Sequence, residues 1–396
     1  MIERLLYGTE ENLNSFEELA PRRRSMFDAA SDAPLNKEPN MNKLARLLHP
    51  ERQYFVVKDI IHETYDINTY RLEPKEPKNL PAFFRAGQYM SFKLKIGDSY
   101  ITRAYSLSSA PLEIFDGFCT VSVKRNQDGF ASQYIHDNWK IGTEVETSGP
   151  QGHCYYSPVR DSKNVVGIAG GSGITPFRSM ARDIVSGNSD FNLTLLYGCR
   201  TEKDIAFKDE FKELAKKSNG KIKVVVILSE EEKDGYEHGF IDKDIIRKYA
   251  PDDFTVFICG PQAMFEFVDG ELEAFGLERK QIRRELFGQV ADVYAIPGYP
   301  SQAIDTVYKL TLHVDGEVKI LPAASKDSLL VTIERSGLKS NSCCRSGECG
   351  SCRGRLISGD VFTIEETNGV RQADRKHNIV HSCITYPLSD VEFEMI

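Results

Sequence analysis

The sequence lacks several features that mark specialised classes of protein. No stretch of its 396 residues approaches the length of an apolar run that crosses a membrane, so we expect no transmembrane helix. The opening residues, MIERLLYGTEEN, contain no apolar core of signal-peptide length. Positive charge is not in excess, since the formal net charge is −8, and this argues against binding of nucleic-acid phosphates. We therefore expect a cytoplasmic protein with no membrane span and no nucleic-acid partner.

The composition is otherwise that of a globular protein, except for one concentration of cysteine. With 41% hydrophobic and 27% charged residues, a chain of 396 residues can form two or three domains with cores of their own. Nine cysteines are present, and four of them lie in the short segment NSCCRSGECGSC, residues 341–352. Because cytoplasmic thiols are mostly kept reduced, this segment favours metal or redox chemistry over a disulfide framework.

The spacing of these cysteines indicates an iron–sulfur cluster. Four residues separate Cys344 from Cys349, two separate Cys349 from Cys352, and 30 lie between Cys352 and Cys383. This is the C-x4-C-x2-C…C pattern of plant-type [2Fe–2S] clusters, whereas structural zinc sites more often carry two C-x2-C pairs or closely spaced histidines. Zinc, or a cysteine-rich loop, is the alternative. The eight histidines show no paired ligand spacing, and we expect Cys343 to be a small buried side chain.

The residues around these cysteines predict a small domain. Gly347 and Gly350 permit a tight bend that turns backbone N–H groups toward sulfur. Upstream, YKLTLHVDGEVKIL is typical of a hairpin with its turn at Asp315 and Gly316, and DSLLVTIERSG is typical of a helix. With the ligand spacing, residues 308–396 resemble a plant-type ferredoxin domain. The resemblance implies a β-grasp-like α+β fold, with a [2Fe–2S] cluster held by Cys344, Cys349, Cys352 and Cys383.

A second motif lies in RAYSLSSAP, residues 103–111. It follows GQYMSFKLKI, whose alternation of apolar and polar residues predicts a strand, and it precedes GFCTVSVKR and DGFASQYIHDNW. This order resembles the antiparallel flavin-binding β-barrel of the ferredoxin–NADP reductase superfamily. The resemblance implies that Arg103 binds the flavin phosphate as a planar cation, that Tyr105 lies against the isoalloxazine, and that Ser106 hydrogen-bonds its reactive edge. Further phosphate contacts are implied at Lys124, Gly129 and Ser132. The plainer interpretation is a surface arginine beside a packed aromatic ring.

A third motif, NVVGIAGGSGITPFRSMARDIV, predicts an apolar strand, a glycine turn and a helix. Gly171 and Gly173 allow the chain to approach a pyrophosphate, whose charge a helix N-terminus favours. Pro176 stands where the dehydrogenase fingerprint has a third glycine. The segment GGSGITP nevertheless resembles the pyridine-nucleotide domain of the same superfamily, an α/β domain with a parallel sheet. This resemblance implies cofactor contacts from Thr175 and Pro176.

The strands predicted after this helix end in a further motif. NLTLLYGC, KIKVVVIL and FTVFICG follow, and the last ends in Cys259-Gly260-Pro261, at the edge where parallel sheets bind ligands. The superfamily places this cysteine beside the nicotinamide. The resemblance therefore makes Ser106, Thr175 and Cys259 the candidate catalytic residues of hydride transfer, with Gly260 and Pro261 as cofactor contacts. Taken alone, Cys259 is a buried strand residue. Three further cysteines are predicted to be inert core residues: Cys119, Cys154 and Cys199.

The three motifs together predict an electron-transfer enzyme. The chain resembles NAD(P)H-dependent reductases that serve multicomponent systems, such as those of phenylacetyl-CoA epoxidase, ketosteroid hydroxylase and hybrid-cluster protein. A hydride delivers two electrons and a [2Fe–2S] cluster accepts one, so a flavin is expected between them. We predict electron flow from NAD(P)H to flavin, to the cluster, and on to a separate electron-accepting protein, an oxygenase or another redox enzyme. The alternative is a redox sensor or electron carrier without steady turnover.

The predicted architecture is multidomain, with boundaries that follow the motifs. In chain order the parts are an N-terminal extension (1–51), the flavin-binding β-barrel (52–156), the NAD(P)H-binding α/β domain (157–288), a proline-containing linker (289–307) and the ferredoxin domain (308–396).

The identities of the cofactors rest on weaker signals. Among the reductases that the chain resembles, those with a C-terminal ferredoxin and this barrel motif mostly use FAD, although the phthalate dioxygenase reductase group uses FMN. FAD is therefore predicted. Arg200, in YGCRTEKD, can meet a 2′-phosphate, but Glu202 and Asp204 would repel one. NADH is therefore held slightly ahead of NADPH.

Residues 1 to about 51 lie outside these resemblances. Ser15 and Glu18 match a capping box, RRR at 22–24 is a short basic run, and NKLARLL at 42–48 predicts one or two amphipathic helical turns. An extension that packs on the barrel is the simpler interpretation, and a docking element for a partner is the alternative.

Overall fold

The computed structural model describes most of the chain: Leu19 and residues 21–31, 39–127, 129–286, 288, 290, 292–365 and 369–396. The chain divides into two compact units, Met1–Arg46 and Leu47–Ile396. Residues 21–28 are helical, with the three arginines exposed, and helix α2 (Asn40–Leu48) confirms the predicted helical turns. Ser15 and Glu18 lie outside the described residues. None of the helices in the described ranges is long and apolar enough to cross a membrane.

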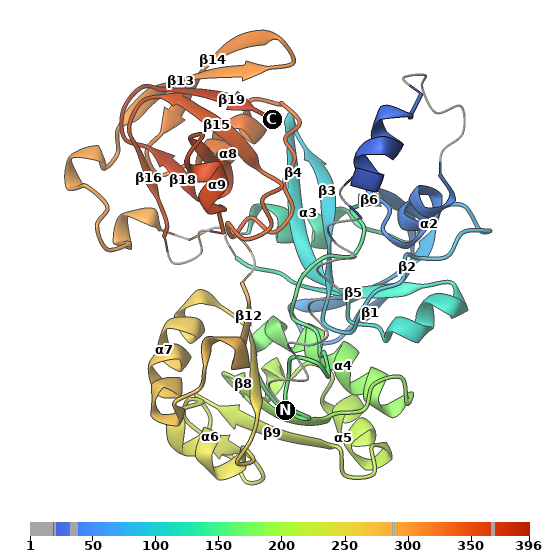
Figure 1. The fold of residues 1–396 in the computed structure, drawn as a ribbon. Coiled ribbons are helices and arrows are strands. Elements are labelled where there is room, and N and C mark those ends of the chain that lie inside the picture. The colour runs from blue at the N-terminus through green and yellow to red at the C-terminus, as the bar shows by residue number, and fades with distance from the viewer. Residues whose placement is uncertain are drawn as a thin grey trace, which may run out of the picture. The chain divides into compact units, whose positions relative to one another are not determined.

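The first domain of the larger unit is a curled antiparallel sheet of six strands around an apolar core (Figure 1). Its order is β4-β3-β6-β1-β2-β5, and a bridge between Leu107 and Val121 joins the end of β4 to β5. The alternation predicted for β3 places Phe92 and Leu94 in the core, with lysines between and after them on the exposed face. The elements are β1 (Gln53–His62), β2 (Ile67–Pro74), β3 (Tyr89–Ile96), β4 (Ser99–Ser106), β5 (Cys119–Lys124), α3 (Phe130–Asn138) and β6 (Glu144–Thr147).

The second domain is a parallel sheet with helices on both faces (Figure 1). Its order is β10-β9-β8-β7-β11-β12. The apolar run of β7 is buried on both sides: Val165 packs into the core that includes α4 and α5, and Val166 into the core that includes α6 and α7. The elements are β7 (Asn164–Gly170), α4 (Thr175–Val185), β8 (Asn192–Cys199), α5 (Lys208–Lys217), β9 (Ile222–Leu228), β10 (Glu237–His238), α6 (Lys243–Tyr249), β11 (Thr255–Cys259), α7 (Gln262–Leu272) and β12 (Ile282–Glu285).

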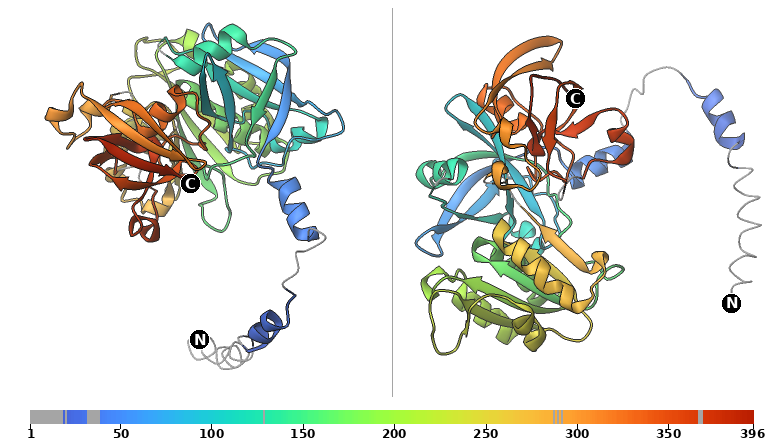
Figure 2. Two further views of the ribbon diagram at one scale, coloured as in Figure 1. Left: turned by 90° about the horizontal axis from the view of Figure 1, so that it is seen from above. Right: turned by 90° about the vertical axis from the view of Figure 1, so that its left-hand side faces the viewer.

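The third domain is a mixed sheet with one helix packed on it, seen in orange and red in Figure 2. The order is β14-β13-β19-β15-β17, with β13 and β19 parallel and the other pairs antiparallel. The predicted hairpin is present, since Asp315 and Gly316 form its turn with φ values of 50° and 80°. The elements are β13 (Val307–Val314), β14 (Glu317–Ala324), α8 (Leu329–Arg335), β15 (Arg353–Ser358), β16 (Val361–Thr363), α9 (Gln372–Arg375), β17 (Ile379–His381), β18 (Thr385–Pro387) and β19 (Val391–Met395).

The segment predicted as a linker contributes to the core of the third domain. Val293 is buried in a cluster with Tyr386, and the Tyr294 hydroxyl lies 2.9 Å from the Ser325 hydroxyl. The Tyr299 hydroxyl donates to the Ser325 carbonyl oxygen at 3.1 Å. Much of this segment is therefore packed structure, and the exact domain boundaries stay predictions.

Helix α4 fixes the second domain to the first. The guanidinium of Arg178 donates to the Ser108 carbonyl oxygen at 3.1 Å, and Arg182 forms an ion pair with Glu113. The Ser179 hydroxyl also donates to the barrel backbone. Because α4 begins at the glycine turn, these contacts hold that turn close to the strand that carries the RAYS motif.

Candidate functional site

The four predicted cluster ligands lie together, arranged as two pairs. Backbone N–H groups of Ser346 and Cys349 each donate to the Cys344 sulfur at 3.4 Å, which pairs Cys344 with Cys349. Cys352 and Cys383 hydrogen-bond to each other and form the second pair. Among the described residues, no group of three or more histidine, cysteine or acidic side chains could hold a single metal ion. Two pairs suit a [2Fe–2S] cluster, in which four thiolates are shared between two irons.

In each pair, the hydrogen bond between the two thiols lowers the pKa of one and raises the pKa of the other. The Cys344 thiol donates to Cys349 and lowers the pKa of Cys349 to about 6. The hydrogen bond with Cys383 likewise lowers the pKa of Cys352, while the pKa of the other thiol in each pair is raised by the same interaction. Thiolate is the form that binds metal, so the lowered pKa values favour binding by Cys349 and Cys352, whereas Cys344 and Cys383 would lose their protons as the metal binds.

The loop geometry explains how the ligands are presented. Gly347 and Gly350 have φ values of 85° and 72°, which confirms the predicted tight bend. Arg345 also has a positive φ of 62°, and its buried guanidinium forms a 2.5 Å ion pair with Glu334 of α8. His381 is no ligand in this arrangement: its Nδ1 lies 2.5 Å from the Gly347 carbonyl oxygen and holds the loop.

The cysteines outside the ligand set have structural surroundings. Cys343 is half-buried, and Gln151 Nε2 of the barrel donates to its sulfur at 3.5 Å. It is thus less buried than predicted, because it lies where two domains meet. The three predicted core cysteines, Cys119, Cys154 and Cys199, are all buried.

The predicted flavin residues occupy strand β4. Arg103 donates to the Thr102 carbonyl oxygen at 2.8 Å, and the Tyr105 ring lies 5.8 Å from that of Phe92. Burial, aided by repulsion from Arg345, lowers the pKa of Arg103 to about 10. Arg103 is half-buried, forms no salt bridge within the described part of the chain, and feels the charge of Glu334, which acts to raise its pKa. A planar cation that is still partly accessible can bind a flavin phosphate.

The three further phosphate candidates divide between two places. Gly129 precedes α3, and a side chain there would lie 2.2 Å from the Ser132 hydroxyl, so only glycine fits. Lys124 instead pairs with Asp66 at 3.3 Å and reaches toward Gly171, where a Cβ would lie 3.8 Å from its Nζ. The structure therefore places Lys124 beside the nucleotide loop, a position that its sequence neighbours did not indicate.

The glycine turn lies directly against the end of β11. A Cβ on Gly173 would lie 2.0 Å from the Cys259 carbonyl oxygen and 2.8 Å from the Gly260 nitrogen. Thr175 closes the turn, since its hydroxyl donates to the Ser172 carbonyl oxygen at 3.1 Å, and Pro176 follows in the first turn of α4. Pro261, after Gly260, opens helix α7. The two predicted nucleotide motifs are thus one site.

Glu285 is a candidate that the sequence reasoning missed. Its strand β12 pairs in register with β11, so that Glu285 lies opposite Cys259, and its carboxyl lies close to the Ser106 hydroxyl. The side chain is buried, and neither oxygen has a partner of good hydrogen-bond geometry among the described residues. Burial, aided by repulsion from Glu348, raises the pKa of Glu285 well above its usual value. Its one signal in the sequence is an acidic residue at the end of a strand, in RRELFG.

Acidic residues lie around Arg200, just after strand β8. Arg200 is exposed and lies 3.6 Å from Glu230, in an ion pair open to solvent that contributes little. Glu202 accepts hydrogen bonds from Lys208 and other donors, which lower its pKa to about 2. Asp204 accepts from the Tyr65 hydroxyl at 2.7 Å. This edge carries charges that suit a ribose hydroxyl better than a 2′-phosphate.

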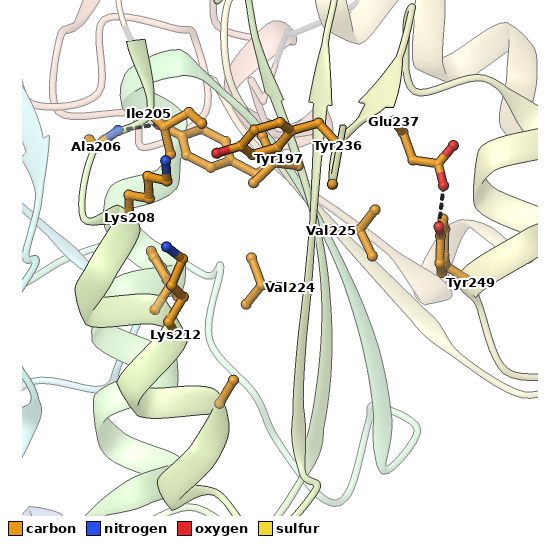
Figure 3. Close-up of a pocket in the computed structure, with 14 residues that line it drawn as sticks. Tyr197, Ile205, Ala206, Lys208, Lys212, Val224, Val225, Tyr236, Glu237 and Tyr249 are labelled. Carbon is orange, nitrogen blue, oxygen red and sulfur yellow. Dashed lines mark hydrogen bonds between the residues drawn. The ribbon is translucent and has the colours of Figure 1, made fainter. Parts of the chain in front are cut away.

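A separate cavity of about 500 Å³ opens at the outer edge of the parallel sheet. Lys208 and Lys212 of α5 line one side and Val224 and Val225 of β9 the other (Figure 3). None of the predicted site residues lines this cavity. The candidate site therefore lies where the three domains meet.

Three family models match the chain in the predicted order. The oxidoreductase FAD-binding domain matches residues 55–156, the oxidoreductase NAD-binding domain matches residues 168–270, and the 2Fe-2S iron-sulfur cluster binding domain matches residues 312–388. These matches confirm the predicted fold class and the predicted cofactors, FAD, a [2Fe–2S] cluster and NAD(P)H.

The relatives with the same domain order are reductase components. The glycine betaine monooxygenase reductase subunit of Chromohalobacter salexigens is 26% identical over 348 residues, covering 85% of this chain and 93% of its own. One component of the 1,2-phenylacetyl-CoA epoxidase of Escherichia coli is 29% identical over 350 residues, covering 85% and 95%. The structure of phthalate dioxygenase reductase has the same fold, with a TM-score of 0.62 and 24% identity over 87% of this chain and 97% of its own. The chain is therefore an NAD(P)H oxidoreductase that combines an FAD-binding domain, an NAD-binding domain and a C-terminal 2Fe-2S domain.

Proposed function

We propose that the chain passes electrons from NADH, through FAD and a [2Fe–2S] cluster, to a separate oxygenase component. The observation that supports this most strongly is the convergence of three domains on Tyr89. Tyr89 of the barrel is buried in a cluster with Cys344 of the third domain, and burial, together with the nearby Cys344 and Glu285, raises its pKa. Residues from all three domains thus surround one buried tyrosine.

The barrel and the nucleotide domain supply the residues for hydride transfer. Bound FAD would supply the conversion between a two-electron donor and a one-electron acceptor. Arg103, with Gly129 and Ser132 at the start of α3, would hold its phosphates. Ser106 and Glu285 would flank the reacting edge, and Glu285, kept protonated by burial, would hold a proton there.

The nucleotide loop would bind the coenzyme. Gly171 and Gly173 would admit the pyrophosphate beside Lys124, while Thr175 and Pro176 fix the turn and Cys259, Gly260 and Pro261 form the opposite wall. The coenzyme is proposed to be NADH because the carboxylates near Arg200, those of Glu202, Asp204 and Glu230, would repel a 2′-phosphate. The oxygenase partner is proposed from the relatives, which include components of a glycine betaine monooxygenase and of an epoxidase.

An anaerobic titration tests the proposed function. The purified protein is titrated first with NADH and then with NADPH while its visible spectrum is recorded. We expect flavin and cluster absorbance to bleach together with NADH at a lower concentration than with NADPH. Absence of cluster absorbance would refute the ligand assignment, and slow bleaching of the flavin by both coenzymes would favour a sensor without steady turnover.

The role of the N-terminal extension is tested by truncation. Deletion of residues 1–45 is expected to leave NADH oxidation with an artificial acceptor unchanged. If transfer to the partner protein also survives, the extension is no docking element.

A further inference from the structure

Strand β4 carries two sets of residues on its two faces. Side chains alternate along a strand, so Arg103 and Tyr105 share one face with Ile101, which is buried in the barrel core. Thr102 and Ala104 share the opposite face with Ser106, whose partner across the sheet is Tyr89. The contact surface of Thr102 and Ala104 and the residue proposed to meet the reactive edge of the flavin therefore lie on the same face of one strand.

The second face contacts the segment that leads to the first cluster ligand. The contacts form an ordered series, in which the even-numbered positions 100, 102 and 104 of the barrel meet positions 339, 342 and 344 of the third domain. Lys339 lies over the Tyr100 ring at 5.2 Å, the Thr102 hydroxyl hydrogen-bonds the Ser342 hydroxyl, and Ala104 is buried with Cys344.

The start of this segment is equally close to the barrel. Gly337 has a φ of 79°, and a Cβ there would lie 3.1 Å from the carbonyl oxygen of Asp98, the residue before β4. At the other end, the buried pair of Arg345 with Glu334 ties the cluster loop to helix α8, and α8 packs against β4. The segment is thus held at both ends while it follows the strand.

We infer that Thr102 and Ala104 are positioning residues, which hold the cluster loop against strand β4, on the face that carries Ser106, and so set the rate at which electrons reach the cluster. This inference rests on the proposed function. With the cofactors bound, NADH would give a hydride to the flavin and become NAD⁺, and the reduced flavin would give its two electrons to the cluster one at a time, each being removed by an external acceptor. The proton that accompanied the hydride is released to water.

The side chains at these two positions are suited to that role. Thr102 is 5% exposed and supplies the hydroxyl that the Ser342 side chain meets. Ala104, at 9% exposed, is the small residue that lets Cys344 approach the strand beside Tyr89. A polar anchor and a close apolar contact together define one position of the loop.

A disulfide tests the arrangement directly. In the full chain with its cofactors, Thr102→Cys and Ser342→Cys are combined; their hydroxyls hydrogen-bond directly, so the Cβ atoms lie close enough for a disulfide. We expect mild oxidation to join the two, seen in the intact mass and thiol count, with cluster absorbance retained. The joined protein should reduce its cluster at the wild-type rate. Failure to join, or a joined protein whose cluster NADH no longer reduces, would overturn the inference. Each single variant is the control.

A charged side chain at Thr102 tests whether this contact sets the rate of cluster reduction. For Thr102→Glu we expect flavin reduction by NADH to be unchanged and cluster reduction to slow, because the larger charged side chain displaces the cluster loop from β4 and electron transfer weakens with distance. Thr102→Ser, which keeps the hydroxyl, should restore the rate. An unchanged rate of cluster reduction in Thr102→Glu would overturn the inference. If Thr102→Glu loses its flavin, the disulfide variant provides the test instead. Failure of NADH to reduce the wild-type cluster would instead contradict the proposed function.

Discussion

Gly173 offers a sharp test of the nucleotide site, because its environment leaves no room for a single methyl group. In Gly173→Ala, the new Cβ would lie 2.0 Å from the Cys259 carbonyl oxygen and 2.4 Å from its carbonyl carbon. Ordinary contacts lie near 3.5 Å, so the glycine turn and the end of β11 must separate by more than about 1 Å. The φ of Gly173 is not in the left-handed region, so space alone causes the strain.

The effect should appear in both stability and hydride transfer. Overpacking of this kind costs about 1–3 kcal/mol of unfolding free energy. A displacement of about 1 Å between the two walls of the nucleotide site should slow flavin reduction by NADH roughly 100-fold. Stopped-flow absorbance of the flavin measures the rate, and chemical denaturation measures the stability. Reduction of the cluster by dithionite should be unchanged, which separates this loss from damage to the third domain.

Gly270 provides the matched control. It lies inside helix α7, and a Cβ there would meet no atom of the described chain within 4 Å. Gly270→Ala should therefore stabilise the protein by about 0.5–1 kcal/mol and leave hydride transfer unchanged. An unchanged NADH rate in Gly173→Ala would refute the close packing of the turn against β11 and the reasoning built on it.

Further predictions concern the cluster, the buried carboxyl and the coenzyme. Cys349→Ser should lose the cluster, and Cys343→Ser should keep it, as iron analysis and visible absorbance will show; equal loss in both would contradict the ligand set. Because the pKa of Glu285 is raised in the folded protein, its contribution to the free energy of unfolding is fully present below the ordinary carboxyl pKa of 4.5. This contribution is lost as the pH rises through the raised value. Glu285→Gln should flatten this decline in denaturation curves recorded against pH, and an unaltered slope would refute the assignment. Glu230→Arg should raise the preference for NADPH roughly tenfold, since a charged hydrogen bond contributes about 1.5–3 kcal/mol. Steady-state kinetics with both coenzymes measure this preference. An unchanged ratio of the NADPH rate to the NADH rate would show that this edge does not contact the ribose.

Much of the site could be predicted because its residues form compact local patterns. The first three cysteines, the RAYS strand and the GGSGITP turn each lie within nine residues or fewer, and the structure gives each the expected local form. Glu285 carries no such pattern, since its partners Ser106 and Cys259 come from other strands and a strand-end glutamate is common on surfaces. Its burial against two domains is a property of the assembled fold.

The two faces of β4 show how a short turn determines which side chains meet another domain. β3 and β4 pair in register from Ile96 opposite Ser99, through a turn in which Gly97 has a φ of 59°. This register places Phe92 opposite Arg103 on the core face. A shift of one residue would exchange the two faces, because side chains alternate along a strand. Arg103 would then point toward the cluster loop and Thr102 into the barrel. The two-residue turn therefore decides that Thr102, Ala104 and Ser106 face the cluster loop while Arg103 and Tyr105 face the barrel core.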